Sequence, residues 1–398
     1  GPYRMFDRHS YTTAPVYSGG RLFTLGEKIL YANDAYNGRL LWEKELPSLE
    51  PRVNLPRDCG YMVTDRDHVY LAIENNCLEI NARTGKTERK FSCPKINDEY
   101  DYNWGYAAMA DGLLFGSSVR SGNFYTEGRG PWYDDSGFNN VQDSHKVLSD
   151  CLFAVDLAGN SQAWKYNGVI INSTIAIGGD QIYFVENRNP KVLQDKSRRL
   201  SGGKEWMALY LVALDVKTGK PVWEKGMQFE QRTPVFFSTY KEDILMLLRS
   251  STKSFDLRAI DAKSGKLMWD REHGWENDNH GAHRRHPVII GDVVYQQPRA
   301  YDLKTGEEKW STSKVGVGGN CGTLSASSTM LFSRLSDYPG FIDLGKGMNK
   351  ENLVEITRPG CWINIIPVGG IVLVPEAGSG CSCEYSIHAS MGFLPIKN

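Results

Sequence analysis

The chain has 398 residues, of which 46 are basic and 47 acidic, giving a formal net charge of −1. The charges are spread along the chain without the basic block that follows a phosphate backbone, so we expect no nucleic-acid partner. Forty glycines, 20 tyrosines and 10 tryptophans, with few long helical patterns, predict an all-β protein rich in turns.

The apolar stretches are too short to cross a bilayer. The longest one, residues 362–375, is interrupted by Pro367, and we expect no transmembrane segment. No signal peptide opens the sequence, and Gly1–Pro2 resemble a protease-cleavage scar, so we expect the sequence to be part of a larger native chain. Eight cysteines, an even number, suit disulfide bonds in an oxidising compartment.

One hairpin signature recurs along the chain. Each copy has alternating apolar residues, an Asp or Asn, a Gly four residues later, then an apolar pair and an aromatic residue. The copies end at Trp42, Phe91, Trp164, Trp223, Trp269 and Trp310, with Phe91 in the place of tryptophan. The Asp carboxylate can cap the turn and the Gly can supply a positive φ. We expect each closing tryptophan to lie between neighbouring sheets and hold one unit to the next.

A second hairpin signature, apolar–x–Gly–Asp/Gly–x–apolar–Tyr/Phe, precedes the first, as in "AIGGDQIYFV" and "VIIGDVVYQ". Two hairpins per unit make a four-stranded blade. Eight units predict an eight-bladed β-propeller that forms a single domain over residues 1–398. Seven blades are the alternative, if the final unit is completed by the N-terminus. The last two units lack the Asp–Thr–Gly–Trp hairpin.

The Asp–x–Lys–Thr/Ser–Gly–x–x–x–Trp hairpins resemble the tryptophan-docking repeat of pyrroloquinoline-quinone-type (PQQ-type) propellers across nearly all of the chain. Four further stretches resemble a bacterial branch of that superfamily of the planctomycete type. They are "DNHGAHRRHPVIIGD", "PRAYDLKTGE", "NCGTLSAS" and "RPGCWINIIPVGGIVLVPEAGSGCSC". The resemblance implies the propeller fold. The close cysteine pair Cys381 and Cys383 is not vicinal as in quinoprotein alcohol dehydrogenases, so we do not expect PQQ as a cofactor.

Two kinds of link meet at one end of a propeller, namely those that enter the innermost strands and those that join second to third strands. Insertions of the second kind are predicted at about 117–150 and 185–208, where they would rise beside the central opening. Both are polar and rich in glycine and aromatic residues.

Four of the eight histidines lie between positions 273 and 286, in the link that enters the sixth unit. His280, His283 and His286 could hold a divalent metal such as Zn, Mn or Cu, which would polarise a substrate oxygen. Alternatively, one of them could act as a general acid or base while Arg232 neutralises an anionic substrate. A purely structural role, capping loops, is the third interpretation.

Aromatic and amide side chains at corresponding links could bind substrate, since flat aromatic faces stack on sugar rings. The substrate-binding candidates are Trp104, Tyr106, Asn172, Asn279 and Trp362. For any one of the aromatic residues, packing of a loop against a blade is the alternative.

Four cysteines are predicted at the same end of the ring: Cys321, Cys361, Cys381 and Cys383. A disulfide among them is the favoured interpretation, thiolate ligation of a metal or free thiols being the alternatives. Cys77, Cys93 and Cys151 read as ordinary strand or loop cysteines.

Together these features predict a periplasmic or extracellular propeller enzyme, a lyase or hydrolase acting on a carbohydrate or uronate-like substrate at the histidine-rich opening. The expected ligand is a small molecule or a polysaccharide. One alternative is a non-catalytic binding or scaffold propeller that uses the same end of the ring, resembling the lipoprotein that assists outer-membrane protein assembly. The other is a redox protein with a quinone or copper centre.

Overall fold

The computed structural model describes most of the chain. The described residues are 14–26, 28–47, 60–122, 146–200, 203–227, 236–251, 254–274, 285–311, 322–335, 338–347, 349–357, 359–360, 365–375 and 389–395. Of the residues predicted to form a site, Trp104, Tyr106, Asn172 and His286 lie within these ranges.

Four-stranded antiparallel sheets account for most of the strands. In the first half of the chain they are β1 (Val16–Ser18), β2 (Arg21–Gly26), β3 (Ile29–Asp34) and β4 (Leu40–Glu45), then β5 (Met62–Thr64), β6 (His68–Ile73), β7 (Asn76–Asn81) and β8 (Thr87–Ser92). In the second half they are β17 (Phe236–Lys241), β18 (Ile244–Ser250), β19 (Ser254–Asp261) and β20 (Leu267–Gly274), β21 (Val288–Ile290), β22 (Val293–Gln296), β23 (Arg299–Asp302) and β24 (Glu308–Ser311), and β25 (Ser325–Ala326), β26 (Met330–Leu335), β27 (Tyr338–Asp343) and β28 (Asn349–Asn352). Three strands, β29 (Ile366–Val368), β30 (Ile371–Val374) and β31 (Met391–Phe393), form the last sheet within the described residues.

A larger sheet lies between the β5–β8 and β17–β20 sheets. Its strands are β9 (Tyr102–Ala110), β10 (Leu113–Arg120), β11 (Lys146–Asp156), β12 (Ser161–Gly178), β13 (Gln181–Asn187), β14 (Arg199–Leu200), β15 (Leu209–Asp215) and β16 (Pro221–Met227). The long strand β12 joins two repeats, because its first part pairs with β11 and its second part with β13. The segment between β13 and β15 also contains α1 (Pro190–Gln194) and the 3-10 helix η5 (Gly203–Trp206).

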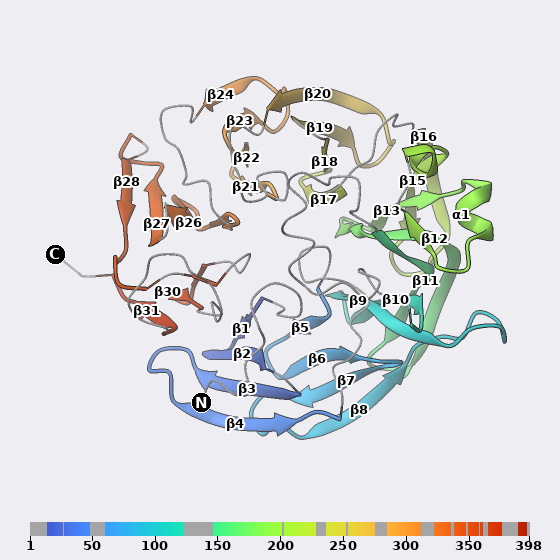
Figure 1. Ribbon diagram of the computed structural model, residues 1–398, viewed down its shortest axis with the longest axis horizontal. Coiled ribbons are helices and arrows are strands. Elements are labelled where there is room, and N and C mark those ends of the chain that lie inside the picture. The colour runs from blue at the N-terminus through green and yellow to red at the C-terminus, as the bar shows by residue number, and fades with distance from the viewer. Residues whose placement is uncertain are drawn as a thin grey trace.

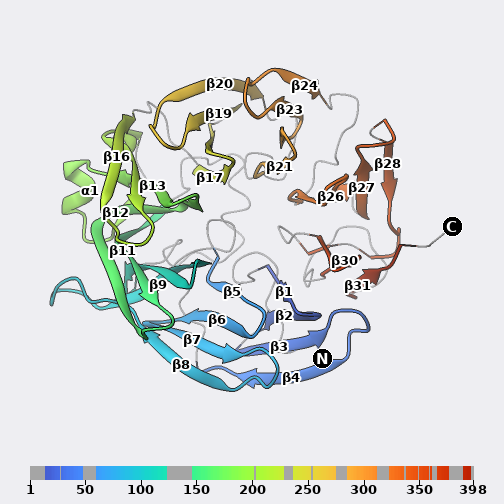
Figure 2. The same ribbon diagram turned by 180° about the vertical axis from the view of Figure 1, so that it is seen from behind.

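The sheets stand around a common centre, with β1, β5, β17 and β21 toward the centre and β4, β8, β20 and β24 at the rim (Figure 1). The view from behind shows the same ring (Figure 2). The fold is therefore a β-propeller, as the repeat predicted. The apolar core lies between neighbouring sheets, where for example Phe23, Tyr70 and Phe153 belong to one buried cluster that draws on three of them.

The ring closes where the last sheet meets the first (Figure 1). Ala35 packs with Ile371 and Leu373, and the Tyr36 hydroxyl donates a hydrogen bond to the Gly369 carbonyl at 3.0 Å. Residues more than 300 positions apart thus complete the same packing that joins consecutive sheets elsewhere. Within the described ranges, no helix is both long and apolar enough to cross a membrane.

The Asp–x–x–x–Gly turns form as the repeat predicted. The Asp215 carboxylate accepts hydrogen bonds from the Thr218 backbone at 2.8 Å and the Thr218 hydroxyl at 2.7 Å, and Asp261 binds Ser264 in the same way. Gly265 closes its turn at a φ of +69°, in the left-handed region. The β27–β28 hairpin repeats this turn at Asp343, although its sequence has no tryptophan to follow.

Trp42, Trp164, Trp223 and Trp269 each dock on the turn of the next repeat. The Trp223 indole donates a hydrogen bond to the Ala262 carbonyl at 2.9 Å, and Trp269 does the same to Leu303 at 2.9 Å. The indole lies so close to the turn that a Cβ added to Gly265 would approach the Trp223 ring at 2.7 Å. The turn glycine is therefore needed both for its φ and for the close approach of the indole.

The prediction that Phe91 replaces tryptophan in the second repeat is wrong. In that position the register places Arg89, opposite Glu79, where the other repeats pair tryptophan with alanine. Arg89 reaches the Leu157 carbonyl of the next repeat at 2.5 Å, and its guanidinium pairs with the buried Glu79 carboxylate. An ion pair thus makes the contact that an indole makes elsewhere.

The two ends of the ring differ in their links. One end, here called the turn face, carries short turns such as residues 19–20, 35–39 and 262–266. The other end, called the loop face, carries the links from one sheet to the next and those between second and third strands, among them residues 74–75, residues 93–101 and the described part of residues 188–208. Because long links are concentrated on it, the loop face is where function is expected.

Candidate functional site

A pocket opens on the loop face between the β5–β8 sheet and β9–β10. Its volume is about 490 Å³. It is bounded by the β6–β7 turn, the link from β8 to β9, the start of β9 and the end of β10. The lining residues are Glu74, Asn75, Cys93, Lys95, Asp101, Tyr102, Asn103, Ser121 and Gly122. All of these elements meet only because two neighbouring repeats pack side by side (Figure 1).

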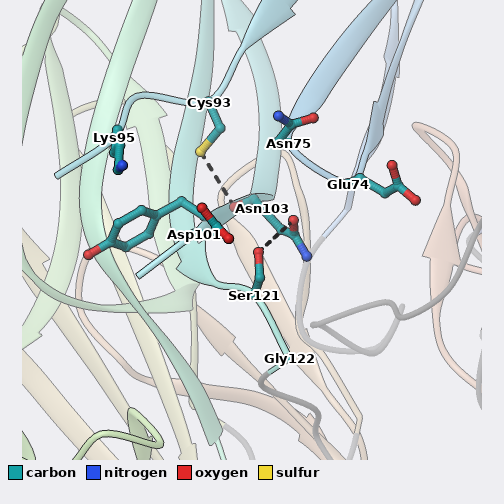
Figure 3. Close-up of a pocket in the computed structure, with 9 residues that line it drawn as sticks. Glu74, Asn75, Cys93, Lys95, Asp101, Asn103, Ser121 and Gly122 are labelled. Carbon is teal, nitrogen blue, oxygen red and sulfur yellow. Dashed lines mark hydrogen bonds between the residues drawn. The ribbon is translucent and has the colours of Figure 1, made fainter. Parts of the chain in front are cut away.

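The inner part of the pocket is built around Asn103. The Ser121 hydroxyl donates to Asn103 Oδ1 at 3.0 Å, and the Cys93 thiol donates to the Asn103 carbonyl at 3.5 Å (Figure 3). The same thiol lies 3.2 Å from the Ser118 hydroxyl. Burial raises the pKa of Cys93 to about 12, which keeps it a protonated thiol and a poor nucleophile or metal ligand.

The rim of the pocket is charged. Glu74 and Lys95 lie on opposite sides of it, with Asp101 between them (Figure 3). Lys95 is in an ion pair with Asp98 at 3.0 Å. The Glu74 and Asp101 carboxylates make no ion pair within the described part of the chain. The rim therefore has an excess of negative charge.

One wall of the pocket rests on a buried ion network. The Tyr102 hydroxyl donates to Asp150 at 3.3 Å, and Asp150 also pairs with Arg120 at 2.6 Å and with Arg198. Burial, together with the charge of Asp150, raises the pKa of Tyr102 to about 12. The Tyr102 ring is thus fixed at the pocket by an internal carboxylate.

The same network anchors the second insertion. Arg198 belongs to that insertion, and its guanidinium also donates to the Val192 and Leu193 carbonyls, at 2.6 and 2.9 Å, at the C-terminal end of α1. Strand β14 pairs with the start of β11, so this part of the second insertion lies against the sheet. The first insertion, between β10 and β11, begins after Arg120 and ends before Lys146, which is narrower than the predicted 117–150.

Of the three histidines predicted to form a site, His286 lies within the described residues. Its ring stacks on Phe237 with a centroid separation of 4.1 Å and an interplanar angle of 15°. Phe237 is in β17, and His286 directly precedes β21, two strands that lie toward the centre of the ring in both views (Figures 1 and 2). This histidine is therefore at the loop face close to the ring axis.

The other predicted site residues within the described ranges lie deeper. Trp104 is only 5% exposed, donates to the Tyr106 carbonyl and packs edge-on against Phe153. Tyr106 is half-buried against an apolar cluster of the next sheets. Asn172 is 3% exposed and accepts a hydrogen bond from Ser149 at 2.7 Å, while its Nδ2 has no partner among the described residues. The structure does not bring these three to the pocket lining.

The remaining predicted site residues lie outside the described ranges. They are Arg232, Asn279, His280, His283, Trp362 and the four cysteines Cys321, Cys361, Cys381 and Cys383. Their roles stay predictions. Among the described residues no group of three or more His, Cys, Asp or Glu side chains is placed to hold a metal ion. Cys77, Cys93 and Cys151 are free thiols.

The residues that line the pocket were not singled out by the sequence. Glu74 and Asn75 occupy a short turn, at which Glu74 takes a φ of +49°, and Asp101 and Asn103 flank the start of β9. The polar runs "ENN" and "NDEYDYN" were the available signal. Only the register of two neighbouring repeats places those runs together.

Comparisons with known proteins agree with this fold. Residues 207–316 match the family described as outer membrane protein assembly factor BamB. These residues carry the BamB-type repeat. A search of curated proteins gives no match.

Among solved structures, BamB from Moraxella catarrhalis is 12% identical, with a TM-score of 0.51, over 92% of this chain and 91% of that chain. A quinohemoprotein alcohol dehydrogenase from Pseudomonas putida HK5 is 11% identical, with a TM-score of 0.58, over 94% of this chain and 71% of that one. The corresponding enzyme from Comamonas testosteroni is 12% identical, with a TM-score of 0.56, over 94% and 72%. At these identities the likeness shows the PQQ-type propeller fold alone.

Proposed function

We propose that this chain is an extracytoplasmic binding propeller that holds a small-molecule or polysaccharide ligand on its loop face. The observation that carries the proposal is the polar pocket of about 490 Å³ on that face. Its volume falls within the roughly 300–1,000 Å³ of small-ligand sites. Binding requires only the hydrogen-bonding groups that the pocket supplies.

The proposal is tested by titrating the purified chain with neutral and uronate oligosaccharides in a calorimeter. We expect a dissociation constant in the micromolar to millimolar range for at least one of them. If none binds, the proposed function is wrong. A polypeptide ligand captured by the same face would instead support a scaffold resembling BamB, whose family matches residues 207–316.

A carbohydrate or uronate lyase or hydrolase is the second candidate. The position of His286 beside β17, close to the ring axis, favours it. In this function His280, His283 and His286 would hold a divalent Zn, Mn or Cu ion or exchange protons, and Arg232 would neutralise a carboxylate. Incubation with oligogalacturonate, read by ultraviolet absorbance of an unsaturated product and by released reducing ends, tests it. His283→Ala should abolish turnover without lowering the unfolding temperature.

We also propose the number of blades and the branch of the superfamily. Strand β12 pairs with β11 through its first part and with β13 through its second part, so the larger sheet can be divided into two blades that share this strand. This division supports a single domain of eight blades rather than seven. Assignment to the planctomycete-type branch rests on the four sequence stretches that resemble it. An experimental density map at the loop face would test the blade count, the metal and the disulfide among Cys321, Cys361, Cys381 and Cys383 together.

A further inference from the structure

We infer that the pocket between the β5–β8 sheet and β9–β10 is a site for a neutral, hydroxyl-rich ligand, such as an uncharged oligosaccharide. The inference rests on the proposed function for the general class of ligand. It adds the place and the charge of that ligand, and it separates this site from the histidine segment near the ring axis.

The pocket offers unused hydrogen-bonding groups of both kinds. Asn75 Oδ1 accepts from Asn76, and Asn103 Oδ1 accepts from Ser121 at 3.0 Å, which leaves both Nδ2 groups without a partner among the described residues. The Glu74 and Asp101 carboxylates supply acceptors on the rim. A hydroxyl group both donates and accepts, so a row of ligand hydroxyls can satisfy amide donors and carboxylate acceptors at once.

The charge of the rim argues against an acidic ligand. Two unpaired carboxylates, with Lys95 already paired to Asp98, would repel a uronate and leave its carboxylate without a guanidinium partner. The same carboxylates are exposed to solvent, where water screens their repulsion of an anion as well as their attraction for a cation, so a charge on the ligand gains little affinity from them. The groups that lie deeper, Asn103, Cys93 and Tyr102, are all uncharged. A neutral polar ligand therefore suits both the rim of the pocket and its deeper part.

The pocket is also held in shape before a ligand arrives. Tyr102 is 5% exposed and tied to Asp150, while Asn103 is fixed by Ser121 on one side and by the Cys93 thiol on the other. Groups that need no rearrangement lose little conformational entropy on binding. A weakly attractive set of neutral hydrogen bonds can then give measurable affinity.

The test compares Asp101→Ala and Asn103→Ala with wild type in calorimetric titrations against cellotetraose, xylotetraose and tetragalacturonate. Asp292→Ala is the control, because Asp292 is also an exposed aspartate but lies on the turn face, where it forms a solvent-exposed ion pair with Lys304. We expect wild type and Asp292→Ala to bind a neutral tetrasaccharide alike, and each pocket variant to bind it at least tenfold more weakly. Asp101 is exposed at the rim, so its variant should keep the wild-type unfolding temperature even if Asn103→Ala does not.

The outcomes separate this inference from the proposed function. Neutral binding that survives both Asp101→Ala and Asn103→Ala overturns the pocket site but keeps a carbohydrate-binding propeller. If only tetragalacturonate binds, the pocket site is likewise overturned while the carbohydrate-binding propeller is kept, and the site is then expected near Arg232. Competition by spermidine at equal concentration overturns the neutral-ligand assignment in favour of a cation. If none of the three saccharides binds, both the pocket inference and the proposed function are wrong.

Discussion

At the scale of single residues, the contact between a docking tryptophan and the next turn determines which positions must be glycine. Gly265 and Gly38 have similar positive φ values, +69° and +75°, yet only Gly265 lies beneath an indole. The two positions therefore separate backbone strain from the steric demand of the tryptophan.

We predict that Gly265→Ala destabilises the fold by about 3 kcal/mol, since it adds a clash with Trp223 to the cost of a left-handed alanine. Gly38→Ala, where nothing lies within 4 Å of the added methyl group, should cost only about 1 kcal/mol. Urea unfolding followed by tryptophan fluorescence measures both. Equal losses at the two positions would contradict the docking account.

His273 links stability to pH. It is buried, with Nδ1 at 2.8 Å from the Tyr301 hydroxyl, and burial lowers its pKa to about 4, with Arg299 adding to the effect. A histidine whose folded pKa lies below its unfolded value near 6.5 stabilises the fold above about pH 6.5, and this contribution is lost as the pH falls toward 4.

Lowering the pH from 7 to 5 should therefore remove about 2 kcal/mol through His273 alone. In His273→Gln, whose side chain does not titrate, the difference between the free energies of unfolding at these two pH values should shrink by that amount. Denaturant titrations at both pH values measure it. An unchanged difference would mean that the pKa of His273 is the same in the folded and the unfolded chain.

At the scale of elements, the hairpins could be predicted from sequence because each carries its turn chemistry within nine residues. The second repeat shows how the pattern can be misread. Four residues separate Gly219 from Trp223, and the same spacing leads from Gly85 to Arg89, the position that the strand register confirms, whereas the choice of Phe91 followed aromatic character instead of spacing. Spacing does not give the contact itself, in which Arg89 pairs with Glu79, the residue in the place of the usual alanine.

The Arg89–Glu79 pair should be replaceable by the usual docking pair. Burial alone would raise the pKa of the Glu79 carboxyl, but hydrogen bonds from Arg89 and Tyr70 hold it below its ordinary value. We predict that Arg89→Ala, which leaves this carboxylate buried and largely unpaired, costs about 3–5 kcal/mol. The double variant Glu79→Ala/Arg89→Trp should cost less than Arg89→Ala alone. A double variant that costs as much as the sum of its single changes would refute an equivalent docking role.

At the scale of the whole molecule, the ring follows from the repeat, whereas the pocket does not. The repeat has a period, so every unit predicts its neighbour, and closure between Ala35 and Ile371 completes the series. The residues that line the pocket do not follow the repeat. Glu74 and Asp101 come from two different links, which meet only once the sheets are packed. Sequence reasoning predicted that the links between sheets and those between second and third strands share one end of the ring, as they do, but it could not identify which polar links face one another.

A ring of this kind should distribute its stability over contacts between neighbouring sheets. Trp42 and Trp269 dock at interfaces that share no sheet, whereas Trp223 and Trp269 both involve the β17–β20 sheet. Each Trp→Phe change keeps the ring contact but leaves a carbonyl without its donor, at a cost of about 1–3 kcal/mol. We predict that the Trp42 and Trp269 changes add to within about 0.5 kcal/mol, while the Trp223 and Trp269 changes depart from additivity by more than that. Unfolding free energies of the two double variants and their single parents decide it. Equal coupling in both pairs would show that the ring responds as one body and not through its nearest-neighbour interfaces.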